Sequence, residues 1–447
     1  MIRFTVGLIS LFGYAASSSR SFHVESNFTD NLDVLSYEDQ ITHVFKERMP
    51  KLASRNDLVK KGSTERDHVH EVIFAVQMRN MDELTRIVHD ISDPHSENYG
   101  NHLTREEMHD LISNPEACAE VTSYLLNGGA TVISETNGGG YITAQAPITV
   151  WETMFKTDFF VFQQTHLNGE THEVVRAEHY SVPKEIHHHI EAVMNTIEMP
   201  ILSHMKPKVK MPEVKFDKGR KLLTDGSTTD GTIYPNRIRY FYNMSNVVGS
   251  SLSTQATYGN GLQYFNPNDL EQFQRTVSYQ PLQPAIIANG FTSTTVTDDV
   301  TEGNLDIQYL ISLSPGSPTA FWHFDLSIGN WVVMIATLKV IPYVLSVSYG
   351  SIEDVTSKNE NKILTTSAIQ LSAMGITMVV ASGDSGSADA PQCKYTPTFP
   401  ASSVYFLSVG ATMVSTSYVT NFSDDGRLAT SRLCPMLLFF IFLFVPS

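Results

Sequence analysis

The sequence predicts an α/β protein in which a parallel-sheet domain follows an α+β domain of the split βαβ type. Three observations support this prediction. Strand-like and helix-like segments alternate from residue 69 to residue 204. A basic, turn-rich stretch then occupies residues 205–230. Beyond it, residues 376–381 form a nearly continuous apolar run, which is typical of a strand buried on both faces of a parallel sheet.

Length and composition restrict the classes of protein to consider. The 447 residues suffice for about three domains, and 42% of them are hydrophobic, which excludes a wholly disordered or collagen-like chain. The formal net charge of −16 argues against a general nucleic-acid binder. Three cysteines are too few for a scaffold built on disulfides, and no run of about 18 apolar residues predicts a transmembrane helix.

The amino terminus predicts entry into the secretory pathway. Residues 1–18 combine one positive charge, a short apolar core and small residues, as in a signal peptide, although a buried strand or helix would show the same apolar run. Residues 19–68 are then an N-terminal extension. Three N-x-S/T sequons would be available for glycosylation: Asn27, Asn243 and Asn421. The expected location is therefore secreted or lysosomal.

The first folded unit is expected to span residues 69–204, and a strand candidate at 71–76 opens it. Two pairs of residues predict capping boxes at helix starts: Asn80 with Glu83, and Thr104 with Glu107. Further along, the pattern predicts helices at 117–127 and 151–155, and strands on both sides of Gly138–Gly140 and at 158–162. Such alternation favours an antiparallel sheet with helices on one face.

The stretch at 205–230 carries seven lysine and arginine residues among proline, glycine, serine and threonine. A basic segment between two folded units of an acidic protein suits a processing site, and a plain solvated linker would look the same. Just before it, three histidines stand together at 187–189. They cannot all face one metal ion on a helix or strand, so we expect a solvated surface there and no metal site.

The second unit is expected to span residues 231–414, with a strand at 344–348 and a helix at 356–374. The apolar run at 376–381 leads directly into Ser-Gly-Asp-Ser-Gly at 382–386. Because ligand sites of open parallel sheets lie just beyond the carboxyl ends of strands, this loop is a site candidate. A helix N-cap or an Asx-turn is the alternative.

Glu302 and Asp306 form the second site candidate. They stand four residues apart, so a helix that starts at Glu302 places both carboxyl groups on one face. Two acids this close repel each other when ionised, and one of them should keep its proton to higher pH. Such a pair suits general acid–base chemistry at acidic pH. The alternative is an exposed acidic helix start, stabilised by the helix dipole.

These segments together resemble the sedolisin family, the serine-carboxyl peptidases, and especially its tripeptidyl-peptidase branch. Residues 93–104 (DPHSENYGNHLT) are similar to the propeptide signature D-P-x-S-x-x-Y-G-x-x-L-T. Four further segments match in the family's order: 302–310 (EGNLDIQYL), 344–350 (VLSVSYG), 381–386 (ASGDSG) and 397–412 (PTFPASSVYFLSVGAT). The resemblance therefore covers most of the chain.

The resemblance implies a subtilisin-like peptidase domain after a ferredoxin-like propeptide domain that keeps the enzyme silent until acidification. It implies that Glu302 is the general base toward a serine and that Asp306 orients Glu302. Asp384 would lie in the oxyanion hole, where it must be protonated to donate a hydrogen bond. The implied substrates are peptides or proteins, cut internally or shortened by tripeptides from free N-termini. The cofactor expected for the family is calcium.

The residues beyond 414 depart from the family pattern. Its nucleophile lies in a G-T-S-x-x-x-P motif, but no Gly-Thr-Ser occurs in the sequence. Ser382, Ser385 and Ser387 belong to the oxyanion loop instead, and the divergent tail at 415–447 contains no calcium loop. We therefore expect an incomplete peptidase domain, low stability and no peptidase activity. The alternatives are a non-catalytic decoy or propeptide-type inhibitor, and a truncated gene product.

Overall fold

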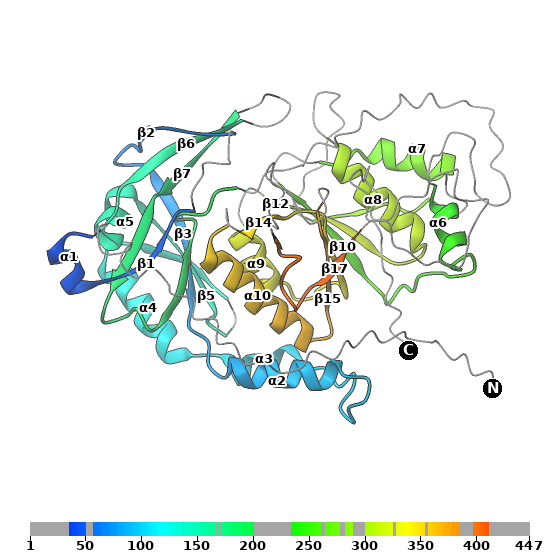
Figure 1. Ribbon diagram of the computed structural model, residues 1–447, viewed down its shortest axis with the longest axis horizontal. Coiled ribbons are helices and arrows are strands. Elements are labelled where there is room, and N and C mark those ends of the chain that lie inside the picture. Colours follow the sequence, from blue (N-terminus) through cyan, green and yellow to red (C-terminus); the bar gives the residue numbers. More distant parts are fainter. Residues whose placement is uncertain are drawn as a thin grey trace, which may run out of the picture.

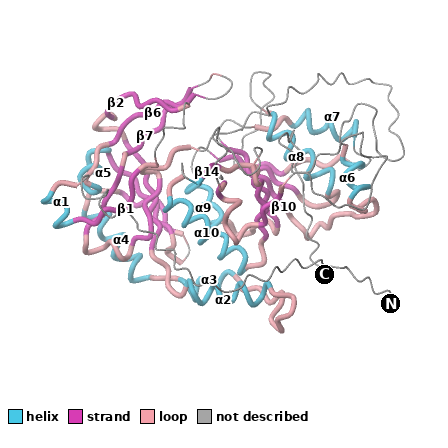
Figure 2. The backbone as a smooth tube through the Cα atoms, in the orientation of Figure 1, coloured by secondary structure: helices cyan, strands magenta, loops and turns pink. Residues whose placement is uncertain are grey.

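The computed structural model describes residues 35–50, 57–136, 138–165, 169, 171–200, 234–260, 264–277, 282–288, 300–324, 328–353, 356–383 and 397–410. They form two units that lie side by side, an N-terminal unit (35–200) and a C-terminal unit (234–410), as Figures 1 and 2 show. Several expected features lie outside the described residues: the signal peptide, the linker at 205–230, the tail at 415–447, Asn27 and Asn421.

A four-stranded antiparallel sheet forms the centre of the N-terminal unit. Its order is β4 (Thr131–Glu135), β5 (Tyr141–Pro147), β3 (Val69–Val76) and β9 (Ile190–Met194). One face, with Val72 and Phe74 of β3, packs on the helices α4 (Pro115–Asn127) and α5 (Ile148–Phe155). Because side chains alternate along a strand, Ile73 and Ala75 belong to the other face. The predicted combination of an antiparallel sheet with helices is confirmed.

The two predicted capping boxes have different outcomes. At α3 (Arg105–Ile112) the Thr104 hydroxyl accepts from the Glu107 amide while the Glu107 carboxylate accepts from the Thr104 amide, which confirms that box. The helix α2 (Met81–Ser92) does follow Asn80, but the predicted box is wrong. Asn80 is left-handed, with φ of 54°, and its side-chain amide donates to the Leu111 carbonyl at 2.8 Å. The Asn80 side chain therefore bonds to a residue of another helix and does not cap α2.

Two smaller antiparallel sheets flank the central sheet of the N-terminal unit. One pairs β1 (His43–Arg48), which follows α1 (Tyr37–Thr42), with β8 (His179–Pro183). The other has the order β2 (Leu58–Ser63), β6 (Phe159–Thr165) and β7 (Thr171–Ala177). The strands β1 and β2 lie in the segment expected as an extension, yet they pair with strands far along the chain. Both sequences are mostly polar, β1 is half-buried and β2 is exposed, and neither shows an alternating apolar pattern.

A six-stranded sheet forms the centre of the C-terminal unit. Its order is β11 (Ile286–Ala288), β12 (Thr319–Phe324), β10 (Gln255–Asn260), β13 (Val344–Val347), β15 (Thr377–Ala381) and β17 (Leu407–Val409). All of its neighbouring pairs are parallel. The strand β15 lies between β13 and β17, so the prediction of an interior parallel strand at 376–381 is confirmed. A short ladder pairs β14 (Ser351–Ile352) with β16 (Thr398–Phe399).

Helices cover both faces of the parallel sheet. On one face Phe321 of β12 packs with Ile307 and Ile311 of α8 (Thr301–Leu313), beside α6 (Pro235–Phe241) and α7 (Pro267–Val277). On the other face Ala320 and Trp322 of the same strand pack with α9 (Ile328–Thr337) and α10 (Lys358–Ala373). The helix predicted at 356–374 and the helix start considered at Glu302 are therefore confirmed.

The helix α10 joins the two units, because it lies between their sheets (Figure 1). Ile73 and Ala192 of the N-terminal sheet share one buried apolar cluster with Leu364 and Ala368 of α10 and Leu345 of β13. Burial of apolar surface is the main favourable contribution to folding, so this shared cluster holds the units together. Among the described residues, no helix is long and apolar enough to cross a membrane.

Candidate active site

The helix α8 carries both predicted carboxyl groups, one turn apart, on the face that meets the parallel sheet. Glu302 is 6% exposed and Asp306 is 0% exposed. The alternative of an exposed acidic helix start is therefore wrong. Ile307 and Ile311 anchor the helix on the sheet through Phe321. Two carboxyl groups are thus held on a rigid element inside the protein, where burial makes ionisation costly.

Asp306 is hydrogen-bonded by side chains from two neighbouring strands. The Thr257 hydroxyl of β10 donates to Oδ2 at 3.0 Å, and the Ser348 hydroxyl donates to Oδ1 at 2.8 Å. Ser348 directly follows β13, which runs parallel to β10 with Thr257 opposite Ser346. Both carboxyl oxygens are therefore fixed from the sheet, and the orientation of the Asp306 side chain is defined.

Burial decides the ionisation of Asp306. It raises the pKa of this carboxyl to about 7, although the hydrogen bonds from Ser348 and Thr257 pull the pKa the other way. Asp306 therefore holds a proton in mildly acidic solution. A protonated carboxyl can donate a hydrogen bond, whereas an ionised one can only accept.

Gly303 and Asn304, which lie between the two acids, attach α8 to the first turn of α7 and to the residues just before it. The Asn304 side chain donates to the Asp269 carboxylate at 2.9 Å and accepts from the Asn266 amide at 2.8 Å. A Cβ atom on Gly303 would lie 2.1 Å from the Tyr264 carbonyl oxygen. Only glycine allows the backbone to approach this closely.

The replacement Gly303→Ala is expected to lower the free energy of unfolding by about 1–3 kcal/mol, because the added methyl group overlaps the Tyr264 backbone. Urea unfolding of the full chain measures the loss. Gly62→Ala is the matched control, since a Cβ there meets no atom within 4 Å. Equal stability of the two variants would show that the close approach at Gly303 is unimportant.

The predicted oxyanion loop begins beside Ser348. Val347 of β13 pairs with Val380 of β15, so Ser348 and Ala381 are the next residues on adjacent parallel strands. The described chain continues through Ser382 to Gly383, which has a φ of 92°. Asp384 itself lies outside the described residues. The start of the loop therefore lies beside Ser348, which bonds to Asp306, and the role of Asp384 stays a prediction.

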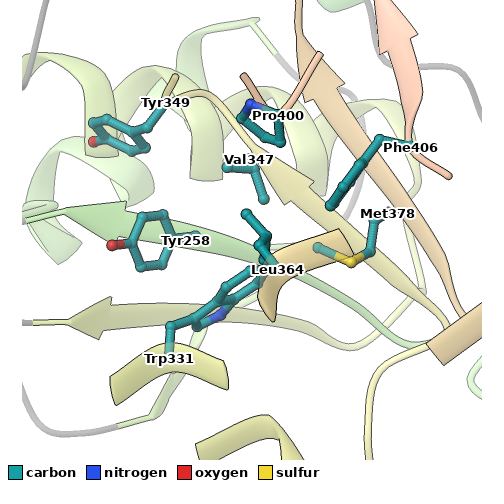
Figure 3. A pocket seen from close by; sticks show the side chains of 8 residues that line it. All are labelled: Tyr258, Trp331, Val347, Tyr349, Leu364, Met378, Pro400 and Phe406. Carbon is teal, nitrogen blue, oxygen red and sulfur yellow. The ribbon is translucent and has the colours of Figure 1, made fainter. Parts of the chain in front are cut away.

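A small apolar hollow lies on the opposite face of the sheet (Figure 3). It is lined by Tyr258, Trp331, Val347, Tyr349, Leu364, Met378, Pro400 and Phe406. Tyr258 follows Thr257 and Val347 precedes Ser348. Because side chains alternate along a strand, Tyr258 and Val347 point to the face away from Asp306. The hollow therefore belongs to the shared apolar core and is separate from the carboxyl pair.

Sequence reasoning missed Thr257, Ser348 and Asn304 as members of the site. Ser348 lies within the matched segment VLSVSYG and Asn304 within EGNLDIQYL, but the sequence assigned neither residue a role. Thr257 carried no signal, because a threonine in a strand is ordinary. Of the described residues, none form a group of three or more His, Cys, Asp or Glu arranged to hold a metal ion. The calcium expected for the family stays a prediction.

Two comparisons with known proteins bear on the family of the chain. Residues 56–199 match the family model described as Pro-kumamolisin, activation domain. The chain is 30% identical over 373 residues to tripeptidyl-peptidase 1 of Homo sapiens, an alignment that covers 79% of this chain and 63% of the relative. The chain belongs to the sedolisin family of serine-carboxyl peptidases. The resemblance to sedolisins predicted from the motifs is confirmed.

Two weaker similarities were also found. Physarolisin of Physarum polycephalum is 27% identical over 390 residues, covering 81% of this chain and 63% of the relative. Among solved structures, a Pseudomonas sedolisin (serine-carboxyl proteinase) complexed with two molecules of pseudo-iodotyrostatin aligns with a TM-score of 0.32 and 22% identity, over 41% of this chain and 55% of that one. The alignments span 63% of the length of tripeptidyl-peptidase 1 from Pan troglodytes and from Homo sapiens.

Proposed function

We propose that the chain is the precursor of a serine-type acid peptidase of the tripeptidyl-peptidase kind. The observation that carries the proposal is the buried pair on α8, with Asp306 held by Thr257 and Ser348 at the edge of a parallel sheet. Glu302 would take the proton of a serine nucleophile, and Asp306 would orient Glu302. Asp384 would donate to the developing oxyanion in its protonated form.

The ionisation of the pair supports work at acidic pH. Burial raises the pKa of Asp306 to about 7, so this residue is protonated at pH 5 and can donate a hydrogen bond to its partner acid. The general-base role proposed for Glu302 requires the ionised form of that carboxyl group. The substrates would be peptides or proteins, either shortened by tripeptides from free N-termini or cut internally.

The N-terminal unit would act as the propeptide. We assign it a ferredoxin-like fold and the C-terminal unit a subtilisin-like, incomplete peptidase fold, with cleavage in the basic linker at 205–230. This assignment is supported by the activation-domain match at 56–199 and by the packing of the unit on α10. The strands β1 and β2 pair with β8 and β6, which favours a propeptide that begins before residue 69.

Peptidase activity is expected to need a segment that the sequence does not contain, since the G-T-S-x-x-x-P motif is missing. The 447-residue chain should not hydrolyse peptides between pH 3 and 7. A chimera of residues 1–410 with the nucleophile-bearing segment of human tripeptidyl-peptidase 1 should do so after acidification. Glu302→Gln or Asp306→Asn in the chimera should lower kcat by about 10⁴-fold.

The outcomes of this assay separate the proposal from its alternatives. A chimera that melts cooperatively but has no activity would contradict the assigned roles. Activity of the 447-residue chain, if removed by Glu302→Gln, would contradict its expected inactivity. The same chain, added at micromolar concentration to an intact tripeptidyl-peptidase, tests whether it acts as a propeptide-type inhibitor. That alternative is favoured by the apolar sheet face of the N-terminal unit.

We also propose that the chain passes through the secretory pathway. Asn243 lies in the sequon Asn243-Met244-Ser245 and is exposed, just beyond Tyr242, the residue that ends α6. Glycosylation at this side chain is therefore sterically open. Expression in a eukaryotic cell should give a product whose mass falls on treatment with a peptide N-glycosidase. The variant Asn243→Gln should lose one glycan, and an unchanged glycan mass in this variant would contradict the assignment.

A further inference from the structure

The N-terminal unit supplies hydrogen bonds to both ends of α10. At the start of the helix, the Glu47 carboxylate of β1 accepts from the Ser357 hydroxyl at 3.0 Å and from the amides of Lys358 and Asn359 at 2.6 and 3.3 Å. At the other end, the Leu103 amide donates to the Ala373 carbonyl at 2.9 Å. Helix ends leave such groups without partners, so the N-terminal unit caps this helix twice.

Three buried carboxyl groups gather at the capped start of α10. Glu47 belongs to β1, Glu198 follows β9 and Glu360 lies in the first turn of α10, and they are 9%, 6% and 8% exposed. Each of Glu47 and Glu360 lies close enough to Glu198 for their charges to repel. Arg176 of β7, 6% exposed, is the cation that lies among them and donates to the Glu198 carbonyl at 2.6 Å. We call these four residues the carboxyl cluster.

The charges of the carboxyl cluster do not balance when all three acids are ionised. The backbone amides of α10 stabilise the negative charge of Glu47. The positive charge of Arg176 can balance that of either Glu198 or Glu360, but not both. Glu198 accepts through Oε2 from the amides of Thr196 and Ile197, whereas its buried Oε1 has no hydrogen-bond partner among the described residues. A buried carboxylate without a counterion is costly, so one acid of the cluster holds a proton.

The pKa directions agree with this charge count. Burial raises the pKa of Glu47 to about 7, and the neighbouring Glu198 adds to the rise. Burial likewise raises the pKa of Glu198 and of Glu360 above their usual range, against the opposing effect of Arg176. In an isolated N-terminal unit or a bare α10, water would reach these groups and lower their pKa values again.

The groups that surround the cluster add no further balancing charge. Facing it are His70 of β3 beyond Arg176, Tyr180 of β8, Tyr258 of β10, and the ion pair of Lys362 with Glu191 near Lys46. The Tyr180 hydroxyl accepts from the Asn359 side chain at 3.0 Å, and burial keeps the pKa of this tyrosine above its usual range. Lys362 already forms an ion pair with Glu191, and the Lys362 side chain is 62% exposed.

We propose that docking of the N-terminal unit on α10 takes up at least one proton at the carboxyl cluster, so that the contact tightens as the solution becomes acidic and loosens as the pH rises. The sign follows from linkage: a carboxyl whose pKa is higher in the docked state binds protons on docking, and docking is then favoured below that pKa. The window is about pH 5 to 7, between the ordinary pKa of 4.5 and the value near 7 at Glu47. The inference does not depend on peptidase activity. If acid releases the N-terminal unit, the groups whose protonation causes the release must therefore lie outside the carboxyl cluster.

Hydrogen exchange of the full chain tests this proposal. The amides of residues 358–360 are followed between pH 5 and 7 and corrected for their intrinsic exchange rates. Their opening constant should rise about tenfold per pH unit for each proton lost on opening. Glu198→Gln removes one negative charge while keeping an acceptor for Thr196 and Ile197, so the slope should fall by about one proton.

Two further variants complete the test. Glu360→Gln is a second probe, with the same expected loss of slope, should Glu198→Gln fail to fold. Glu191→Gln is the matched control: it removes a carboxyl group from the same interface but outside the cluster, and the slope should stay as in the parent chain. A pH-independent opening constant in the parent chain, or an unchanged slope in both cluster variants, would overturn the proposal.

Discussion

The replacement Trp151→Ala is expected to lower the free energy of unfolding of the N-terminal unit by about 3–5 kcal/mol. Trp151 is completely buried on α5. Its ring stacks on Phe155 with the centroids 5.5 Å apart, and its indole N–H donates to the His70 carbonyl at 3.0 Å. The variant therefore leaves a cavity and also a buried carbonyl without its donor.

Urea unfolding of the full chain, followed by circular dichroism, measures this loss. Thr153→Ala is the matched control, because Thr153 lies on the exposed face of the same helix. Its replacement should change the stability by less than about 0.5 kcal/mol. A similar small change for Trp151→Ala would show that the cluster of Phe74, Trp151 and Phe155 does not hold the unit together.

The second large effect is a loss of stability in acid that depends on His70. Burial lowers the pKa of His70 to about 4, and the nearby Arg176 adds to this effect. The unfolded chain binds a proton at this histidine below its ordinary pKa of 6.5, whereas the folded unit does not. The contribution of neutral His70 to the free energy of unfolding is therefore fully present above pH 6.5. As the pH falls toward 4, the free energy of unfolding drops by about 3 kcal/mol.

Thermal or urea unfolding of the full chain at several pH values checks this prediction. His70→Gln keeps a side-chain N–H near the Asn195 carbonyl, which His70 Nε2 contacts at 2.8 Å, but removes the titrating group. Its stability should depend less on pH between 4 and 6.5 than that of the parent chain. His95→Gln, at an exposed histidine, is the control and should keep the parent dependence. Identical pH profiles for all three proteins would contradict the assignment to His70.

His70 and the carboxyl cluster act in opposite directions as the pH falls. Protonation of His70 destabilises the core of the N-terminal unit, whereas protonation of the cluster stabilises its contact with α10. Arg176 lies between them and influences both. An acid-triggered loss of the propeptide would therefore begin inside the N-terminal unit, while the contact with α10 is still strong.

Local sequence patterns were sufficient where a structural feature depends on neighbours in the chain. The Thr104–Glu107 box, the apolar run of β15 and the four-residue spacing of Glu302 and Asp306 all act within one turn or one strand, and the structure has each of them. The same reasoning failed at Asn80. Its side chain bonds to Leu111, a residue of another helix, so no local rule could predict the loss of the cap.

Periodicity and short motifs predicted the α/β class, several elements of the N-terminal unit, the family and the carboxyl pair, because they report on backbone geometry and chemistry close along the chain. What surrounds those groups depends on contacts between distant parts of the chain. Thr257 and Ser348 reach Asp306 across 49 and 42 residues, and Glu47 reaches Ser357 across 310. Sheet topology brings these partners together, and the burial that it creates, rather than the spacing of the acids, sets their protonation.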